Sequence, residues 1–443
     1  MGPATTSSPP AIDLRPWEPR GSQWDLAAAT HLLERGGFGP RPGQAERLLD
    51  GDHHEAIDGL LRPAGHDPRF LSGISILLGA GDLEPLAAWW MGLIVGDGDP
   101  LGERLTLMWH DHFATSDEKV GDPRLMHGQN RLFRERGAGD FRALCHAAAK
   151  DPCMLKWLDG DLNRAGHPNE NFAREVMELF VLGIGNYTEH DILEAARAFS
   201  GWGTKGRTFR FRERYHDAGE KTVLGRTARF SPEEVLDWIL EQPAAARHVA
   251  RRVLAEFVTS EPDPALVEAA ATRLVELGWN IEGLVDGVLR SAAFFDPAHR
   301  RGRIAGPVAL IARATRRLDL GAPPRDLAWA AAEMGQSLFR PPSVKGWDGG
   351  EVWINAGTWT ARHNAPLDAL ADLDDDALAA ALGRPDSRGA AADLALDGLL
   401  PGLADAGELR AALQREASSA GSLADALRIA TALVLVSPDY QRI

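Results

Sequence analysis

The sequence has little cysteine and no long apolar run, and each deficit excludes a class of protein. Its two cysteines, Cys145 and Cys153, match no zinc or redox spacing, so we expect two buried free thiols and no disulfide framework. No uninterrupted apolar run approaches the roughly 20 residues that a membrane helix requires. The N-terminus has no basic start followed by an apolar stretch, so no signal peptide is visible and the chain as written is expected to be cytoplasmic.

The chain also has fewer basic residues than acidic residues. Lys and Arg number 48 and Asp and Glu number 63, which gives a formal net charge of −15. An acidic surface of this size repels phosphate backbones, so we do not expect nucleic acid as a partner.

Helix-forming patterns dominate the 443 residues, of which 44% are hydrophobic. Residues 1–22 are rich in proline and small polar residues, and we expect a flexible lead-in there. From residue 23 to residue 443 amphipathic segments recur with clear caps, such as Ser231 before Pro232. The sequence therefore predicts a mainly α protein with one large helical domain over residues 23–443.

One stretch interrupts the helical pattern with an alternation typical of strands. In "RTFRFRERYHDAGEKTVLGR", Phe209 and Phe211 alternate with arginines, and the chain turns at Asp217–Gly219 before "KTVLG". This pattern predicts a small β-hairpin over about residues 207–225.

The stretch "GERLTLMWHDHFATSDEKVGD" holds two histidines separated by one aspartate. On a helix, His112 joins the apolar stripe of Leu105, Met108, Trp109 and Phe113, and is expected to point into the core. His110 lies about 200° further around the helix and faces elsewhere. Core packing is the first interpretation of the pair, and a reaction centre that includes His110 is the second.

A helical hairpin is predicted over residues 167–202, "HPNENFAREVMELFVLGIGNYTEHDILEAARAFSGW". Thr188 caps its second helix, with Asp191 in a capping-box relation. On the first helix Asn171, Glu175 and Glu178 share one face, and two carboxylates one turn apart suit metal ligation or general acid/base catalysis. The competing interpretation is a solvated face on which Arg174 neutralises Glu178.

The predicted hairpin turn brings His216, Asp217 and Lys221 together. A turn fixes side chains while leaving them open to a ligand. His216 can act as a base or a ligand near neutral pH, and Lys221 can hold an anionic group. The alternative is an Asx-type turn with incidental neighbours.

A Trp- and Gly-rich loop is predicted over about residues 340–364, with Trp347, Trp353 and Trp359. Tryptophan in such a loop can stack on a sugar or another flat ligand. It can equally anchor an irregular loop on the helices, and we expect at least one of the three to do so.

Six stretches resemble, in this order, the bacterial family described as "domain of unknown function eighteen-hundred". They are "HLLERGGFGPRPG", "RLTLMWHDHFATS", "NENFAREVMELFVLGIGNYTEHDILEAARAFSGW", "HDAGEKTVLG", "GQSLFRPPSVKGWDGG" and "SPDYQ". The resemblance runs from about Trp24 to the C-terminus. It implies one mostly helical unit, but no activity, because none is established for the family.

The resemblance also bears on the site and on partners. Positions matching the family's polar signature imply a shared pocket: His110, His112, Asn169, Glu170, Asn171, Arg174, Glu175, Glu178, His216, Asp217 and Lys221. Many relatives look exported and are often encoded beside a sulfatase-like exported family, which implies a partner of that kind. Where the family commonly reads Trp-His-Asn-His, this chain has Asp111, which adds a carboxylate to the site or a solvated charge.

Two functions compete on these observations. The first is an acid/base enzyme of the hydrolase type, with Glu175, Glu178, His110, His216 and Asp217 as catalytic candidates. Its ligand, an unknown small molecule or glycan, would be bound by Asn171, Arg174, Lys221, Trp347 and Trp353. The second is a non-catalytic binding or assembly protein for a glycan or a protein partner.

A divalent metal is one cofactor that the enzyme could use. His110, Glu175, Glu178 and His216 would give a mixed nitrogen and oxygen set that suits zinc, manganese or iron. The rival is a metal-free network in which Arg174 and Lys221 neutralise the same carboxylates.

Overall fold

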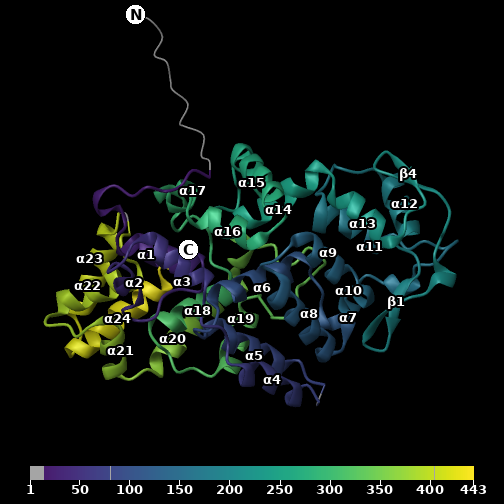
Figure 1. The fold of residues 1–443 in the computed structure, drawn as a ribbon. Coiled ribbons are helices and arrows are strands. Elements are labelled where there is room, and N and C mark those ends of the chain that lie inside the picture. Colours follow the sequence, from purple (N-terminus) through teal and green to yellow (C-terminus); the bar gives the residue numbers. More distant parts are fainter. Residues whose placement is uncertain (1–13, 80, 404) are drawn as a thin grey trace, which may run out of the picture.

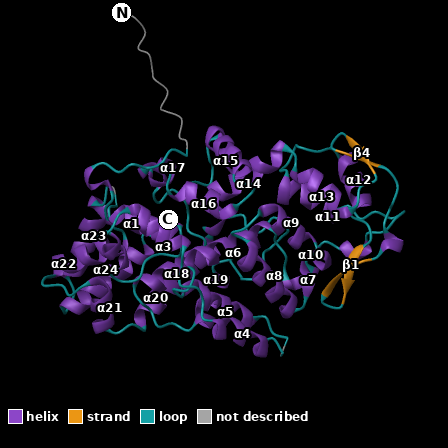
Figure 2. Cartoon of the chain, in the orientation of Figure 1, coloured by secondary structure: helices purple, strands orange, loops and turns teal. Residues whose placement is uncertain are grey.

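The computed structural model describes residues 14–79, 81–403 and 405–443. Helices account for 61% of the chain, which confirms the predicted mainly helical fold (Figures 1 and 2). Within those ranges, no helix combines the length and the apolar character needed to cross a membrane.

The N-terminal helices begin mostly at an aspartate whose carboxylate accepts a backbone N–H of the first turn, as Asp99 does for Gly102. Their bounds are α1 (Leu26–Arg35), α2 (Gln44–Leu48), α3 (His53–Leu61), α4 (Pro68–Leu77), α5 (Glu84–Val95), α6 (Pro100–His112), α7 (Asp117–Val120), α8 (Pro123–Arg136), α9 (Phe141–Ala149) and α10 (Pro152–Trp157).

The predicted helical hairpin is present, and its caps are as expected. Thr188 and Asp191 form the capping box of α12, and Ser231 and Glu234 form that of α13. The first helix changes to π geometry after one turn. The elements are α11 (Asn171–Glu175), the π-helical segment η3 (Val176–Val181), α12 (Glu189–Ala198) and α13 (Pro232–Leu240).

The remaining helices follow in sequence, and Figure 1 shows α21–α24 gathered at the end of the molecule opposite β1 and β4. They are α14 (Pro243–Phe257), α15 (Pro264–Glu276), α16 (Ile281–Leu289), α17 (Ala292–Phe295), α18 (Pro307–Arg317), α19 (Pro324–Glu333), α20 (Ala356–Ala371), α21 (Asp375–Leu382), α22 (Arg388–Leu399), α23 (Gly407–Ser418) and α24 (Leu423–Val436). Short 3₁₀ turns are η1 (Gly21–Gln23), η2 (Gly160–Leu162), η4 (Glu213–Tyr215), η5 (Pro297–His299) and η6 (Gly350–Trp353).

The strands form two hairpins, so the single predicted hairpin over 207–225 is wrong. β1 (Trp202–Lys205) pairs with β2 (Thr208–Phe211), and β3 (Lys221–Val223) pairs with β4 (Arg226–Ala228). Gly206 at φ 63°, and Leu224 and Gly225 at φ 48° and 77°, reverse the chain within two residues. Such tight reversals pair each strand with its nearest neighbour in sequence, rather than across the longer Asp217–Gly219 segment.

Buried apolar residues fall into two clusters. The first core joins α1, α3, α9 and α12–α17, and the second core joins α5, α18, α19 and α21–α24. Helix α6 belongs to both, because Met108 and Trp109 lie in the first core and Leu107 lies in the second. A single domain over residues 23–443 stays a prediction.

One predicted boundary differs from the structure, and another stays a prediction. Of the flexible lead-in expected over 1–22, residues 1–13 lie outside the described residues, and the flexibility of residues 14–22 stays a prediction. Trp17 stacks on Phe295 with ring centroids 4.0 Å apart, because a tryptophan buries enough apolar surface to hold an irregular segment. The loop predicted over 340–364 ends earlier, since Asn355 caps α20.

Candidate functional site

The three residues of the His-Asp-His sequence at the end of α6 point to three different parts of the molecule. The His112 side chain lies in the first core, 8% exposed, with its ring 5.4 Å from that of Trp109. Its Nε2–H donates to the Phe180 carbonyl at 2.9 Å. The inward orientation predicted for His112 is confirmed.

A second histidine makes a similar contact with the backbone. His248 of α14 donates from Nε2 to the Leu179 carbonyl at 2.7 Å. Both carbonyls belong to the π-helical segment, whose wider turn leaves backbone groups in need of partners. The two histidines therefore stabilise η3, and burial lowers the pKa of each below its usual range.

His110 is also buried, at 1% exposed, but in the opposite direction from His112. Its ring lies 5.4 Å from Trp90, 5.5 Å from Phe339 and 5.6 Å from Trp347. Burial lowers the pKa of His110 to about 3, so the ring is neutral at physiological pH. Aromatic side chains cover the ring, which agrees with core packing, the first interpretation of the histidine pair.

Asp111, between the two histidines, lies in the wall of a cleft of about 710 Å³. Its Oδ2 accepts a hydrogen bond from Arg252 Nη2 at 2.8 Å, and its Oδ1 accepts one from the Trp347 amide, also at 2.8 Å. The side chain stays 23% exposed. Burial raises the pKa of the Asp111 carboxyl above its usual range, and the Arg252 guanidinium opposes the rise.

This Asp111 cleft opens where the two cores meet, at the kind of internal boundary where ligand sites are common. Its lining comes from α6, α14, α18 and the loop before α20. The lining includes Arg104, Met108, Asp111, Arg252, Glu256, Arg303, Ala309, Gln336, Trp347, Asp348, Glu351 and Trp353.

Glu256 of α14 lies on the floor of the cleft among arginines. Its carboxylate oxygens lie 3.4 Å from Arg104 Nε, 3.8 Å from Arg303 Nη2 and 4.0 Å from Arg252 Nη1. Burial alone would raise the pKa of Glu256, but the arginines lower it to about 2. One cleft thus holds two carboxyls whose pKa values are displaced in opposite directions, a pattern typical of paired acid/base groups.

Gly346 allows the loop to approach Asp111 this closely. It has φ 81°, a conformation that only glycine adopts without strain. A Cβ atom there would lie 2.2 Å from Asp111 Oδ1. The glycine therefore permits the Trp347 amide to bind the carboxylate.

The carboxylates predicted on the first helix of the hairpin lie elsewhere. Glu178 accepts a hydrogen bond from the Tyr187 hydroxyl at 2.9 Å. Glu175 is half-buried. Burial and the neighbouring Glu178 raise the pKa of its carboxyl, and the positive charges of Arg174 and Lys345 oppose this rise. Asn171 is exposed.

Arg174 does not neutralise Glu178, so that alternative for the helix face is wrong. It donates to Glu189 at 2.7 and 3.0 Å and to Glu170 at 3.1 Å. The change to π geometry after Glu175 rotates Glu178 relative to Arg174, which the α-helical spacing assumed in the prediction could not include.

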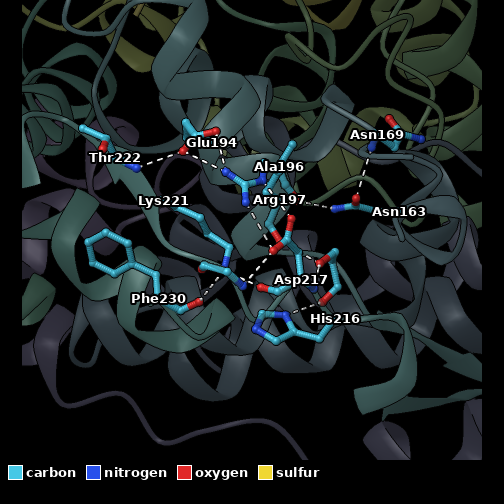
Figure 3. Close-up of polar contacts among 12 residues, drawn as sticks. Asn163, Asn169, Glu194, Ala196, Arg197, His216, Asp217, Lys221, Thr222 and Phe230 are labelled. Atoms are coloured by element: carbon cyan, nitrogen blue, oxygen red, sulfur yellow. Dashed lines mark hydrogen bonds and ion pairs between the residues drawn. The ribbon is translucent and has the colours of Figure 1, made fainter. Parts of the chain in front are cut away.

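Lys221 and Asp217 belong to an interlocked network (Figure 3). Lys221 is 1% exposed, and its Nζ donates to the carbonyls of Asp217, Gly219 and Phe230. Asp217 accepts hydrogen bonds from Arg197, and its amide donates to the Ser200 hydroxyl at 2.8 Å.

His216 completes this region. It lies with Nδ1 3.0 Å from the Ser200 carbonyl, and its ring is 5.6 Å from Phe211. The Gly219 amide donates to Asp217 Oδ1 at 2.9 Å, which is the Asx-type turn named as the alternative. The contacts of Asp217 and Lys221 are thus made within the protein, and a ligand role for these residues stays a prediction.

Two of the three tryptophans in the loop line the Asp111 cleft. Trp347 and Trp353 are each 7% exposed, whereas Trp359 is 37% exposed and lies against His363. Trp347 anchors the loop on His110, as expected for at least one of them. Because so little of the Trp347 and Trp353 rings is exposed, a ligand can contact only their edges, and neither ring offers a face on which a sugar could stack.

The candidate metal ligands do not form a set. Across the described ranges of the chain, no three His, Cys, Asp or Glu side chains lie together in a group that could hold a metal ion. His110 lies in its aromatic enclosure, Glu175 and Glu178 on the α11 segment, and His216 beside Ser200.

Sequence reasoning missed Arg252, Glu256 and Arg303 as members of the cleft. Arg252 and Glu256 are four residues apart on α14, which indicates no more than an ion pair on a helix surface. Their proximity to Asp111 depends on packing between α14 and α6, which are far apart in sequence. The one local signal was Asp111 itself, a carboxylate between two histidines.

Comparison with known proteins agrees with the motifs. The family model described as "Protein of unknown function (DUF1800)" matches residues 31–442. The chain belongs to this family. No curated protein and no solved structure matches the chain significantly. The DUF1800 family has no assigned function, so its description adds none to the geometry of the cleft.

Proposed function

We propose that this DUF1800 protein is an acid/base enzyme of the hydrolase type and that its reaction takes place in the Asp111 cleft. The observation that carries the proposal is the position of the Asp111 carboxylate. It is part-exposed in the cleft wall and held on both oxygens, by Arg252 and by the Trp347 amide. A carboxyl fixed in this way can exchange a proton with a bound molecule without first having to be oriented.

The neighbouring groups suit such a reaction. The raised pKa of Asp111 brings its proton exchange closer to neutral pH. Glu256 stays ionised because arginines surround it, and the N–H groups of Arg252 and Arg303 can stabilise oxygen charge that develops during bond cleavage. Asp111 is therefore the acid/base group, and the arginines are the electrostatic support.

The test is a turnover screen with chromogenic carboxylic esters, glycosides, phosphate esters and sulfate esters. On any substrate that the wild type cleaves, Asp111→Asn should lower kcat at least about 100-fold. The Asn side chain can keep the hydrogen bond from the Trp347 amide, so the fold should persist. Asp368→Asn, at an exposed carboxylate of α20 outside the cleft lining, is the matched control and should behave like wild type.

Glu175→Gln distinguishes this site from the one expected on the first helix of the hairpin. In our proposal it keeps most of the wild-type activity. If Glu175→Gln abolishes turnover and Asp111→Asn does not, the reaction belongs to the α11 segment and the proposal is wrong.

A second candidate, non-catalytic binding of a glycan or protein, draws support from exposed apolar side chains in the loop that lines the cleft and at the start of α20. Val352, Ile354 and Trp359 are 58%, 38% and 37% exposed, which is unusual for three side chains so close in sequence. Trp359→Ala with a glycan array tests this function. Binding that is lost in Trp359→Ala, with no turnover of any ester or glycoside by wild type, would favour it over the enzyme.

A further inference from the structure

We propose that Arg104, Arg252 and Arg303 form a subsite for a singly charged oxyanion of the ligand, a carboxylate or a sulfate group. The subsite deepens the proposed function, because the group that exchanges a proton with Asp111 would then lie next to the anion. Binding at the subsite does not depend on turnover, so the two ideas can fail separately.

The charges on the floor of the cleft do not balance. Three arginines face two carboxylates, Asp111 and Glu256, which leaves one excess positive charge. Side chains here are largely buried: Arg104 is 3% exposed, and Arg252 and Arg303 are each 22% exposed. An uncompensated charge in such surroundings is costly, and a bound anion removes the cost.

Groups beneath and beside the floor do not supply the missing negative charge. Arg35 lies behind Arg104, is fully buried, and adds a further positive charge that acts on Glu256. Glu34, a buried carboxylate nearby, has its own cation in Arg313 at 3.5 Å. The positive excess is therefore confined to the largely buried floor, because the rest of the lining holds Arg442 and three exposed carboxylates, whose charges solvent screens.

Hydrogen-bond donors are available as well as charge. Arg252 uses Nη2 for Asp111 and the Met108 carbonyl, and Arg303 uses Nη1 for the Glu256 carbonyl. Among the residues that the structure describes, no hydrogen bond is made by the other guanidinium nitrogens of these two arginines. Their distances to Glu256, 4.0 and 3.8 Å, are too long for hydrogen bonds. Two guanidinium groups thus present free N–H donors, which match the oxygens of a carboxylate or a sulfate.

The arrangement limits both the charge and the position of the ligand. Exposed carboxylates, Glu261, Asp348 and Glu351, also line the cleft and disfavour additional negative charge on the ligand. Arg252 holds Asp111 with Nη2, so an anion bound by its Nη1 would lie within one guanidinium width of the acid/base carboxyl. The ligand class is an organic monoanion whose reactive bond lies close to its charged group.

The experiment is a calorimetric titration with benzoate, methyl sulfate and phenylphosphonate in low-salt buffer, with benzamide as the neutral match for benzoate. Trp347 and Trp353 line the cleft, so tryptophan fluorescence gives a second readout. We expect benzoate or methyl sulfate to bind at least about tenfold more tightly than benzamide, the difference that one charge-assisted hydrogen bond makes. Arg303→Met should weaken anion binding at least about tenfold, and Arg442→Met, an exposed arginine in the same lining, should not.

Glu256→Gln should strengthen anion binding, whereas Arg303→Met should weaken it. A gain in binding cannot result from a simple loss of folding. Removing the competing carboxylate raises the positive excess, so benzoate should bind more tightly and should raise the Tm of this variant more than that of wild type. Equal binding of benzamide and benzoate, anion binding that Arg303→Met leaves unchanged, or weaker binding to a folded Glu256→Gln variant would each overturn the subsite. Tightest binding of the phenylphosphonate dianion would overturn the assignment to a single charge.

Discussion

Arg252 Nη2 donates a hydrogen bond to Asp111 Oδ2 at 2.8 Å, and this contact joins α14 to α6 across the wall of the cleft. It is part-exposed, so its contribution to stability is expected to be modest. Arg252→Met should destabilise the protein by about 1 kcal/mol, because Oδ2 of Asp111 loses its charged partner. Urea denaturation of Arg252→Met, Asp111→Asn and the double variant measures the coupling. Strictly additive effects would mean that the two side chains do not interact in solution.

Gly346→Ala should be more damaging than its backbone conformation alone explains. Gly346 and Gly350 both have positive φ, at 81° and 58°, so alanine at either position costs about 1 kcal/mol in strain. Only at Gly346 would the added Cβ meet Asp111, at 2.2 Å, whereas nothing lies within 4 Å at Gly350. We expect Gly346→Ala to destabilise by at least about 2 kcal/mol more than Gly350→Ala. Equal losses of free energy of unfolding in the two variants would show that the loop does not lie against Asp111.

His110 should make the protein sensitive to acid. The pKa of His110 is lowered from 6.5 to about 3 in the fold, so the unfolded chain binds more protons between those values. Stability therefore falls as the pH falls from 6.5 toward 3, by up to about 1.4 kcal/mol per pH unit from this residue. Urea denaturation at pH 7 and pH 4.5 should show that His110→Leu loses about 2–3 kcal/mol less than wild type. His190→Leu, at an exposed position, is the control, and an unchanged loss in His110→Leu would mean that His110 is not buried as a neutral ring.

Lys221 should prove to be a structural residue. Its Nζ donates to three backbone carbonyls and has almost no exposure. Lys221→Met should therefore destabilise by about 2–4 kcal/mol, because the carbonyls are left without a donor. It should leave the affinity for benzoate in the Asp111 cleft unchanged. A stable Lys221→Met variant that no longer binds benzoate would instead support the anion-binding role that the sequence predicted for Lys221.

Local signals in the sequence were sufficient for much of the helical fold. The inward orientation of His112 followed from helical periodicity, and the caps at Thr188 and Ser231 followed from residue type and spacing. The strand pairing did not follow, because Leu224–Gly225 is a reversal whose first residue is not typical of positive φ. A pattern that identifies strands does not identify their partners.

The candidate site was less predictable, for a physical reason. The sequence showed His110 and Asp111 as adjacent polar residues, but which one meets solvent depends on Trp90, Phe339 and Trp347, which converge on His110 from distant segments. The arginine cluster is likewise assembled from α6, α14 and the chain before α18. An arginine on the surface of one helix does not by itself indicate a binding site. The site exists only because packing brings three arginines from different segments together.

The pH dependence of kcat/KM in wild type and Arg252→Met tests the central claim, that Asp111 is the acid/base group, most directly. The Arg252 guanidinium holds down the pKa of Asp111, which burial raises. Removing that charge must therefore raise the pKa further and move the limb that reports Asp111 to higher pH, whether the carboxyl acts as acid or as base. We predict a limb above about pH 4, the usual value for Asp, that moves upward in Arg252→Met and is absent in Asp111→Asn. A limb at the same pH in wild type and Arg252→Met, in enzymes that both turn over, would contradict the claim.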